Sequence, residues 1–206
     1  MVTFKLLKNR WALSTVVTTL IILVVSVLLA TIVTYYAINV VSTRVQEENL
    51  HLTKQHIWLN GTATPGTSAY AVGALMIVNT GGRDVVLDKI AVRGQECPWN
   101  ESFAGQQKFV LYCTTTGPIE QDLTYVPNFN YTGSPIVNYN VIGSTQYNYT
   151  VATNDLILKS GYTMLIYIVN PDSISVNDVG LTVGITVHTA QAVNYLETNV
   201  QAVASS

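Results

Sequence analysis

The stretch NRWALSTVVTTLIILVVSVLL, residues 9–29, decides the first part of the fold. No Asp, Glu, Lys, Arg or His occurs from Trp11 to Thr43, and no Gly or Pro occurs before Gly61. In lipid, a single spanning segment satisfies all of its backbone hydrogen bonds only as a helix. The stretch therefore predicts a long apolar helix that meets a membrane at some stage.

The flanks of this run indicate its orientation. Lys5, Lys8 and Arg10 precede it, whereas seven Lys or Arg and all twelve Asp or Glu of the chain follow from Arg44 onward, a net charge of −5. The positive-inside rule then keeps the N-terminus in the cytoplasm and places the rest of the chain outside. The acidic balance and the lack of a basic cluster exclude nucleic acid as a partner.

The far end of the run distinguishes it from a conventional secretory signal peptide. The sequence TYYAINVVSTRVQEENL has no small-residue cleavage pattern, and its two tyrosines, Tyr35 and Tyr36, are placed like an interfacial aromatic belt. If the polar sequence beyond this belt stays helical, the helix runs from residue 13 to residue 55. Composition alone leaves open a shorter membrane span, Leu13 to Thr34, with Trp11 and the tyrosines at its two interfaces.

Beyond Gly61 the pattern changes to short β-rich runs separated by Gly, Pro and Asn. In GLTVGITVHT, four apolar residues alternate with Thr, Gly and His, which is typical of a strand with one buried face. About seven such strands predict a β-sandwich. The expected fold is α+β: a basic leader (1–12), a helix (13–55) and an Ig-like or pilin-like β-sandwich (56–206). The other predicted strands cover residues 70–79, 84–94, 108–113, 155–161 and 162–170.

The segment from residue 125 to residue 150 is dense in Tyr, Asn, Gly and Ser. Such a composition suits a binding loop that presents rigid amphipathic rings, and it suits equally a solvated insertion whose Tyr rings cover the sandwich edge. The rings that form the predicted contact surface are Tyr125, Phe129, Tyr131, Tyr139, Tyr147 and Tyr149.

Two kinds of covalent modification are predicted outside the membrane. Cys97 and Cys113 are an even pair in the exterior part, which favours a disulfide over two buried free thiols. Asn-x-Ser/Thr sequons make four residues available for N-glycosylation: Asn60, Asn100, Asn130 and Asn148.

Motifs for catalysis are missing from the sequence. His51, His56 and His188 are the only histidines, and none has the spacing of a zinc, iron or copper site. There is no Gly-x-Ser-x-Gly, Walker loop, dinucleotide fingerprint or Cys-x-x-Cys. The expectation is a protein of structure or adhesion, with no cofactor and no enzymatic activity.

The leader KNR and the run ALSTVVTTLIILVVSVLLATIVTYY resemble the start of archaeal type IV pilins and archaellins. The segments VNTGGRDVVLDKIAVRG, LKSGYTMLIYIV and VGLTVGITVHT are similar to the β-sandwich of those subunits, so the resemblance covers most of the chain. It implies that a prepilin peptidase cuts between Ala12 and Leu13, and that the mature helices leave the membrane to pack as a filament core.

The resemblance implies an extracellular pilus-like filament built from copies of this chain by an assembly machinery, with adhesion as its role. Small polar contacts between helices are expected from Ser14, Thr18, Thr19 and Ser26, with Val24 in the same interface. The alternative is an uncleaved single-pass membrane protein whose β-domain binds a glycan or a surface-layer protein. An exterior domain with enzymatic or metal chemistry is a third, less supported hypothesis.

Overall fold

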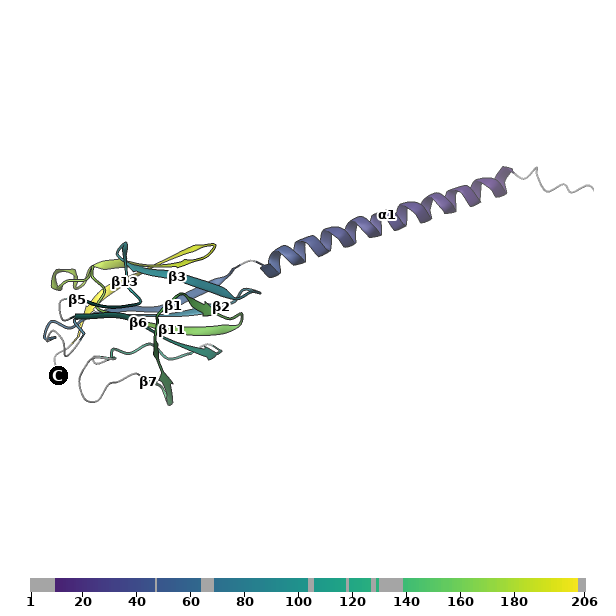
Figure 1. Ribbon diagram of the computed structural model, residues 1–206. Helices are drawn as coiled ribbons and strands as arrows, with labels where there is room; N and C mark the ends of the chain where they lie inside the picture. The colour runs from purple at the N-terminus through teal and green to yellow at the C-terminus, as the bar shows by residue number, and fades with distance from the viewer. Residues whose placement is uncertain are drawn as a thin grey trace, which may run out of the picture. The chain divides into compact units, whose positions relative to one another are not determined.

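The computed structural model describes residues 10–46, 48–63, 69–103, 106–117, 119–126, 129 and 139–203 of the 206-residue chain. It divides into two compact units, Met1–Val45 and Gln46–Ser206. The first contains all but the last residue of the helix α1, Arg10–Gln46, which is drawn as one uninterrupted helix in Figure 1. The second is a β-domain, so the expected order of a long apolar helix followed by a β-rich domain is confirmed.

The β-domain contains thirteen described strands and one 3₁₀ turn. They are β1 (Leu50–Leu59), β2 (Ala71–Asn79), β3 (Val85–Val92), β4 (Gln95–Glu96), β5 (Asn100–Phe103), β6 (Gln106–Thr116), β7 (Tyr139–Ile142), β8 (Thr145–Asn148), β9 (Thr150–Val151), β10 (Leu156–Leu158), β11 (Tyr162–Val169), η1 (Val176–Asp178), β12 (Thr182–Thr189) and β13 (Val193–Ala202).

The helix is shorter than predicted at its C-terminal end. It ends at Gln46, and residues 50–55, which the sequence analysis assigned to the helix, form the first part of the strand β1. Thr80 and Gly81 both donate backbone hydrogen bonds to the carbonyl of Asn49. From there β1 pairs with β2 on one side and β13 on the other. These hydrogen bonds to two strands outweigh the helical preference of a polar segment, since local propensity is a weak constraint.

The main sheet is one curled sheet of eleven strands with the order β10-β3-β12-β13-β1-β2-β11-β6-β5, to which β4 and β9 add at its sides. All its described pairs are antiparallel except β1 with β13, which join the two halves of the sheet in parallel. Because β13 pairs with both β1 and β12, the two halves are continuous. They face each other as the layers of a sandwich do (Figure 1).

The space between the two halves is the main core. Alternate residues of facing strands fill it, as the pattern of residues 180–189 predicted: Val183, Ile185 and Val187 are buried, although Leu181 lies before the strand and is exposed. Its other fully buried members include Ile57, Leu75, Leu87, Ile90, Val110, Leu158, Met164 and Ile166. At about 25 cal/mol per Å² of apolar surface, burial on this scale is the main source of the domain's stability.

A second core lies on the outer face of one half of the sheet. Strands β2 and β11 are buried on both faces over almost their whole length. Residues 119–126, Phe129 and the two-stranded sheet β7–β8 supply the covering side chains, among them Ile119, Leu123, Phe129, Ile142 and Tyr149. The β-domain therefore has a covered outer face, which the sequence analysis did not separate from the sandwich itself.

Candidate assembly helix and candidate contact surface

The described part of α1 has one continuous apolar surface. Ser14–Thr43 is 30 residues long, and its most apolar 18-residue window has a mean hydropathy of 2.9. None of its side chains is buried among the described residues. At about 1.5 Å per residue it is about 45 Å long, whereas the hydrocarbon core of a bilayer is about 30 Å thick. By length and composition it could cross a membrane, and about ten residues of apolar helix would remain.

Three of the four hydroxyl groups that were expected to contact other helices are bonded within α1. The side chain of Thr18 donates to the carbonyl of Ser14 at 2.8 Å, and that of Ser26 donates to the carbonyl of Ile22 at 2.7 Å. Thr19 donates to the carbonyl of Val16 at 2.9 Å. Each hydroxyl keeps an acceptor lone pair, but none needs a partner from another helix to satisfy its donor.

The predicted interface residues do not form one stripe. At about 100° per residue, Ser14 and Thr18 lie on one side of the helix, whereas Thr19 and Ser26 lie about a third of a turn away. Val24 lies on roughly the opposite side from Thr19 and Ser26. A helix that pairs with a single neighbour needs one seam. This distribution suits a helix that is surrounded, either by lipid or by several other helices.

The β-domain begins immediately after α1. The carboxylate of Glu48 accepts a hydrogen bond from Thr189 at 2.8 Å, and its other oxygen lies 3.9 Å from the guanidinium of Arg83. The Glu48 side chain is only 5% exposed. With the carbonyl of Asn49 bonded to the β2–β3 turn, the chain is fixed to the domain from residue 48 onward.

Most of the described aromatic rings that were predicted to form a contact surface are buried or partly buried. Phe129 is 0% and Tyr149 4% exposed, and both pack against Tyr167 of β11 in the second core. Tyr125 and Tyr147 are partly buried against the same core. Of the described rings in this set, only Tyr139 is exposed, at 46%, and Tyr131 lies outside the described residues. The contact prediction is therefore wrong for Phe129 and Tyr149, because their burial on the sheet removes them from solvent.

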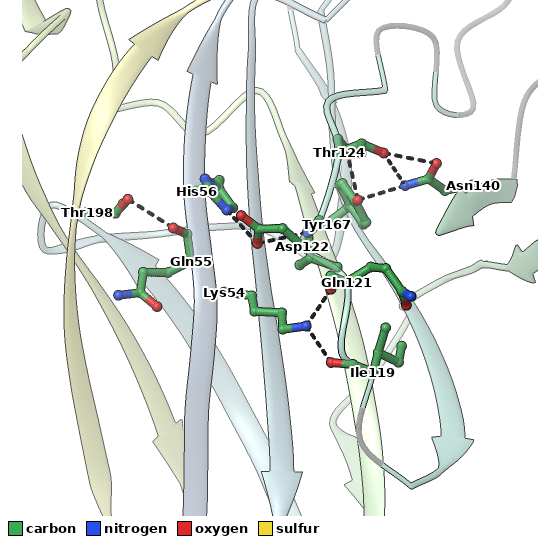
Figure 2. Close-up of polar contacts among 11 residues, drawn as sticks. Lys54, Gln55, His56, Ile119, Gln121, Asp122, Thr124, Asn140, Tyr167 and Thr198 are labelled. Carbon is green, nitrogen blue, oxygen red and sulfur yellow. Dashed lines mark hydrogen bonds and ion pairs between the residues drawn. The ribbon is translucent and has the colours of Figure 1, made fainter. Parts of the chain in front are cut away.

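Residues 119–126, Phe129 and β7–β8 together form the cover of the outer face, and two side chains of β1, Lys54 and His56, make polar contacts with it (Figure 2). The ammonium group of Lys54 donates to the carbonyls of Ile119 and Gln121. His56 lies with its Nε2 2.9 Å from the carboxylate of Asp122 and stacks on Trp58 at a centroid distance of 5.0 Å. Lys54 has a φ of 55° where the β1–β2 register shifts, so a bulge redirects its side chain.

A second set of polar contacts holds the β7–β8 sheet to β11 (Figure 2). The hydroxyl of Tyr167 accepts a hydrogen bond from the amide of Asn140 at 2.9 Å and donates to the carbonyl of Thr124 at 2.9 Å. Burial raises the pKa of Tyr167 above the ordinary range of a tyrosine. The hydroxyl therefore stays protonated and serves as a buried structural group.

The predicted disulfide is absent: Cys97 and Cys113 are both free. Cys97 packs in the main core, whereas Cys113 packs at the edge of the second core, so the sheet lies between them. Burial raises the pKa of the Cys97 thiol to about 12 and also raises that of Cys113. Two thiols on opposite faces of a sheet are a geometry that a disulfide cannot bridge without moving the backbone.

The sequons differ in their surroundings. Asn60 follows β1, is half-buried, and its side-chain oxygen accepts hydrogen bonds from the backbone and the hydroxyl of Thr62. Asn100 begins β5 and Asn148 ends β8, and both are exposed. Asn130 lies outside the described residues.

Within the described residues there is no group of three His, Cys, Asp or Glu side chains that could hold a metal ion. The clearest titratable cluster that the sequence analysis missed is Lys54, His56 and Asp122, and its contacts attach one segment of the chain to another. The alternation of Lys54, His56 and Trp58 in KQHIW was its sequence signal, but the predicted boundary between the helix and the β-domain, after residue 55, separated Lys54 from the other two.

Comparison with known proteins gives no assignment. No family model matches the chain, and no curated protein is significantly similar to it. A long apolar N-terminal helix followed by a β-rich domain is compatible with a pilin-like layout, and this is the extent of the agreement.

Proposed function

We propose that the protein is the structural subunit of an extracellular type IV pilus-like filament that serves surface adhesion. One observation carries the proposal: Ser14–Thr43 is a 30-residue apolar helix, and none of its side chains is buried among the described residues. The described members of both cores of the β-domain come from Leu50 onward, so the helix contributes to neither. An apolar surface of this size is unfavourable in water, so the helix suits a surround of lipid or of other helices.

Lipid and other copies of the helix are the two environments that this surface suits. An apolar helix exchanges lipid for identical neighbours at little cost, because packing and small polar side chains replace the lipid contacts. Neighbours on several sides match the spread of Ser14, Thr19 and Val24 around the helix. Heterologous contacts that do not close on themselves produce a helical filament.

The proposal names the remaining partners by resemblance. A prepilin peptidase cuts the leader between Ala12 and Leu13, the membrane holds the subunit with its N-terminus in the cytoplasm, and an assembly machinery extracts it. In the filament the β-domains form the outer surface, where a glycan or another surface molecule is contacted. No cofactor takes part in this account.

The hydrogen bonds of Thr18, Thr19 and Ser26 to carbonyls of their own helix also support a second function, that of a membrane anchor. Hydroxyl groups bonded in this way fit a lipid environment as well as they fit a helix bundle. In that case the protein is an uncleaved single-pass anchor, and the β-domain alone binds a glycan or a surface-layer protein.

The test is the substitution Val24→Asp in cells that make the protein, with Val24→Leu as the matched control. A carboxylate in the middle of a membrane helix costs about 2.5–3.5 kcal/mol in insertion, and more where the helix must pack among apolar neighbours. We expect Val24→Leu to give filaments of normal length by electron microscopy, and Val24→Asp to give folded β-domain and no filaments. Normal filaments from Val24→Asp refute the proposal, and a wild-type protein that occurs only in the membrane supports the anchor.

A further inference from the structure

The hairpin β7–β8 presents an apolar face that no described residue covers. Its inner face carries Asn140 and Ile142, both buried on the second core. On the outer face, Tyr139 is 46% and Val141 50% exposed. The hairpin is a two-stranded sheet of its own and lies at the outside of the β-domain (Figure 1).

The register of the hairpin places a sequon on the same face. Tyr139 is the direct partner of Asn148, and Val141 is the direct partner of Gln146. Directly opposite residues of an antiparallel pair share a face, with Cβ atoms about 4.5–5.5 Å apart. Asn148 is exposed and begins the triplet Asn-Tyr-Thr. An acceptor for N-glycosylation therefore stands beside the exposed ring.

The conformation of the triplet leaves the acceptor amide open. Tyr149 is buried in the second core, whereas Asn148 and Thr150 on either side of it are exposed. The side-chain oxygen of Asn148 accepts a hydrogen bond from Gln146 at 3.0 Å. Among the described residues, none accepts a hydrogen bond from the Asn148 amide nitrogen, so that Nδ2 faces solvent with both of its protons free.

We propose that Asn148 carries an N-linked oligosaccharide whose first sugar packs on the ring of Tyr139 and covers the outer face of the β7–β8 hairpin. The inference rests on the proposed function only in placing the β-domain outside the cell. The C–H groups of a sugar carry partial positive charge, and the face of an aromatic ring is negative, so the two attract when stacked. Burial of Tyr139 and Val141 under the sugar adds a hydrophobic contribution.

The attachment is a glycosyl transfer from a lipid phosphate-linked oligosaccharide, which an extracellular transferase must supply. The Asn148 Nδ2 forms a bond to the anomeric carbon of the first sugar, and the bond from that carbon to the phosphate oxygen breaks. Nδ2 loses one proton, and the lipid phosphate leaves with the electron pair of the broken bond. No oxidant or reductant is needed.

The other described sequons lack this arrangement. Asn100 is the direct partner of Phe109, which is only 2% exposed and offers no ring to a sugar. Asn60 lies after the end of its strand, with its side-chain oxygen bonded twice to Thr62. Of the described sequons, Asn148 is thus the one at which a glycan would also cover exposed apolar side chains, those of Tyr139 and Val141.

The experiment compares wild-type protein from the cell surface with Thr150→Val and with the matched control Thr145→Val. Thr150→Val removes the sequon and keeps Asn148, whereas Thr145→Val makes the same change on the same hairpin and keeps the sequon. Peptide mass mapping reads the glycan, and hydroxyl-radical footprinting reads the exposure of Tyr139. Tyr195, which is 60% exposed on β13, is the internal reference ring.

We expect a glycan on Asn148 in the wild type and in Thr145→Val, with Tyr139 oxidised several-fold less than Tyr195. In Thr150→Val the glycan is lost and Tyr139 oxidation rises several-fold towards that of Tyr195. Unmodified Asn148 in the wild type overturns the inference, and so does a Tyr139 footprint that does not change when the glycan is lost. Unmodified Asn148 in intact filaments overturns this inference alone, whereas glycosylated Asn148 without filaments overturns only the proposed function.

Discussion

Replacement of Phe129 by alanine tests whether the Tyr-rich segment is part of the folded core. Phe129 is 0% exposed, and its ring lies 4.8 Å from the ring of Tyr167 and 5.3 Å from that of Tyr149. Truncation of a fully buried Phe typically costs about 3–5 kcal/mol of unfolding free energy, since the surroundings collapse only partly into the cavity. A solvated insertion would lose almost nothing.

The assay is urea unfolding of the fragment 46–206, which includes all of β1 and corresponds to the compact unit of the β-domain. A fragment that begins at residue 56 would lack half of that strand. With a urea m-value of about 2 kcal/mol/M, the expected loss lowers the midpoint by about 2 M.

Tyr139→Ala is the matched control for Phe129→Ala. It removes a ring of the same segment that is 46% exposed and packs on neither core, so we expect a change within about 0.5 kcal/mol. If Phe129→Ala also changes the unfolding free energy by no more than that, the second core is not a cooperative part of the domain, and the account of the cover is wrong.

Three further predictions concern buried polar groups and thiols. Tyr167→Phe removes one of the two hydrogen bonds that the buried amide of Asn140 donates, and it removes the hydroxyl that donates to the carbonyl of Thr124. We therefore expect a loss of about 1–3 kcal/mol in urea unfolding, and no loss would contradict the network. Burial raises the pKa of Asp122, but the hydrogen bonds from His56 and the backbone amide of Leu123 together lower it by more than burial raises it. The pKa of Asp122 therefore lies below its usual value. The pair's contribution is therefore present above the unfolded pKa of about 3.9 and is lost as pH falls through the lower folded pKa. Because the Asp122 side chain is 66% exposed, Asp122→Asn should cost less than about 1 kcal/mol at pH 6 and nothing in strong acid, and an equal cost at both pH values would contradict this. Thiol titration of unreduced, denatured protein should find both Cys97 and Cys113 free, and a melting temperature that falls on reduction would show a bridge instead.

The parts of the fold that the sequence predicted well are those with a strong period. The apolar run fixed α1, and the alternation of Val183, Ile185 and Val187 fixed β12 and its buried face. Both patterns can be read without knowing the tertiary contacts, because burial and exposure repeat along each element with the period of that helix or strand.

The strand β1 was not predictable in the same way. In the first half of β1 the even-numbered residues Leu50 and Leu52 pack on the main core. In the second half the odd-numbered residues Ile57 and Leu59 do so, because the bulge at Lys54 shifts the register between them. Such a shift hides the alternation from any count of period two. The strand is stabilised by β2 and β13, which come later in the chain.

The candidate contact surface failed for a related reason. Tyr and Phe have the same composition signal whether they cover a sheet or face a ligand. What separates Phe129 and Tyr149 from Tyr139 is the doubly buried pair β2 and β11 beneath them, which offers a second apolar face. In the sequence those two strands read as continuous apolar runs, and this was the available signal that both of their faces are covered.

The most direct test of the central claim is the N-terminal sequence and intact mass of the chain recovered from filaments sheared off the cell surface. The account predicts that the chain is present in those filaments and begins at Leu13, because the leader is removed before α1 packs among its copies. A chain that begins at Met1 or Val2 and is found only in the membrane would contradict it, and α1 would then be an anchor.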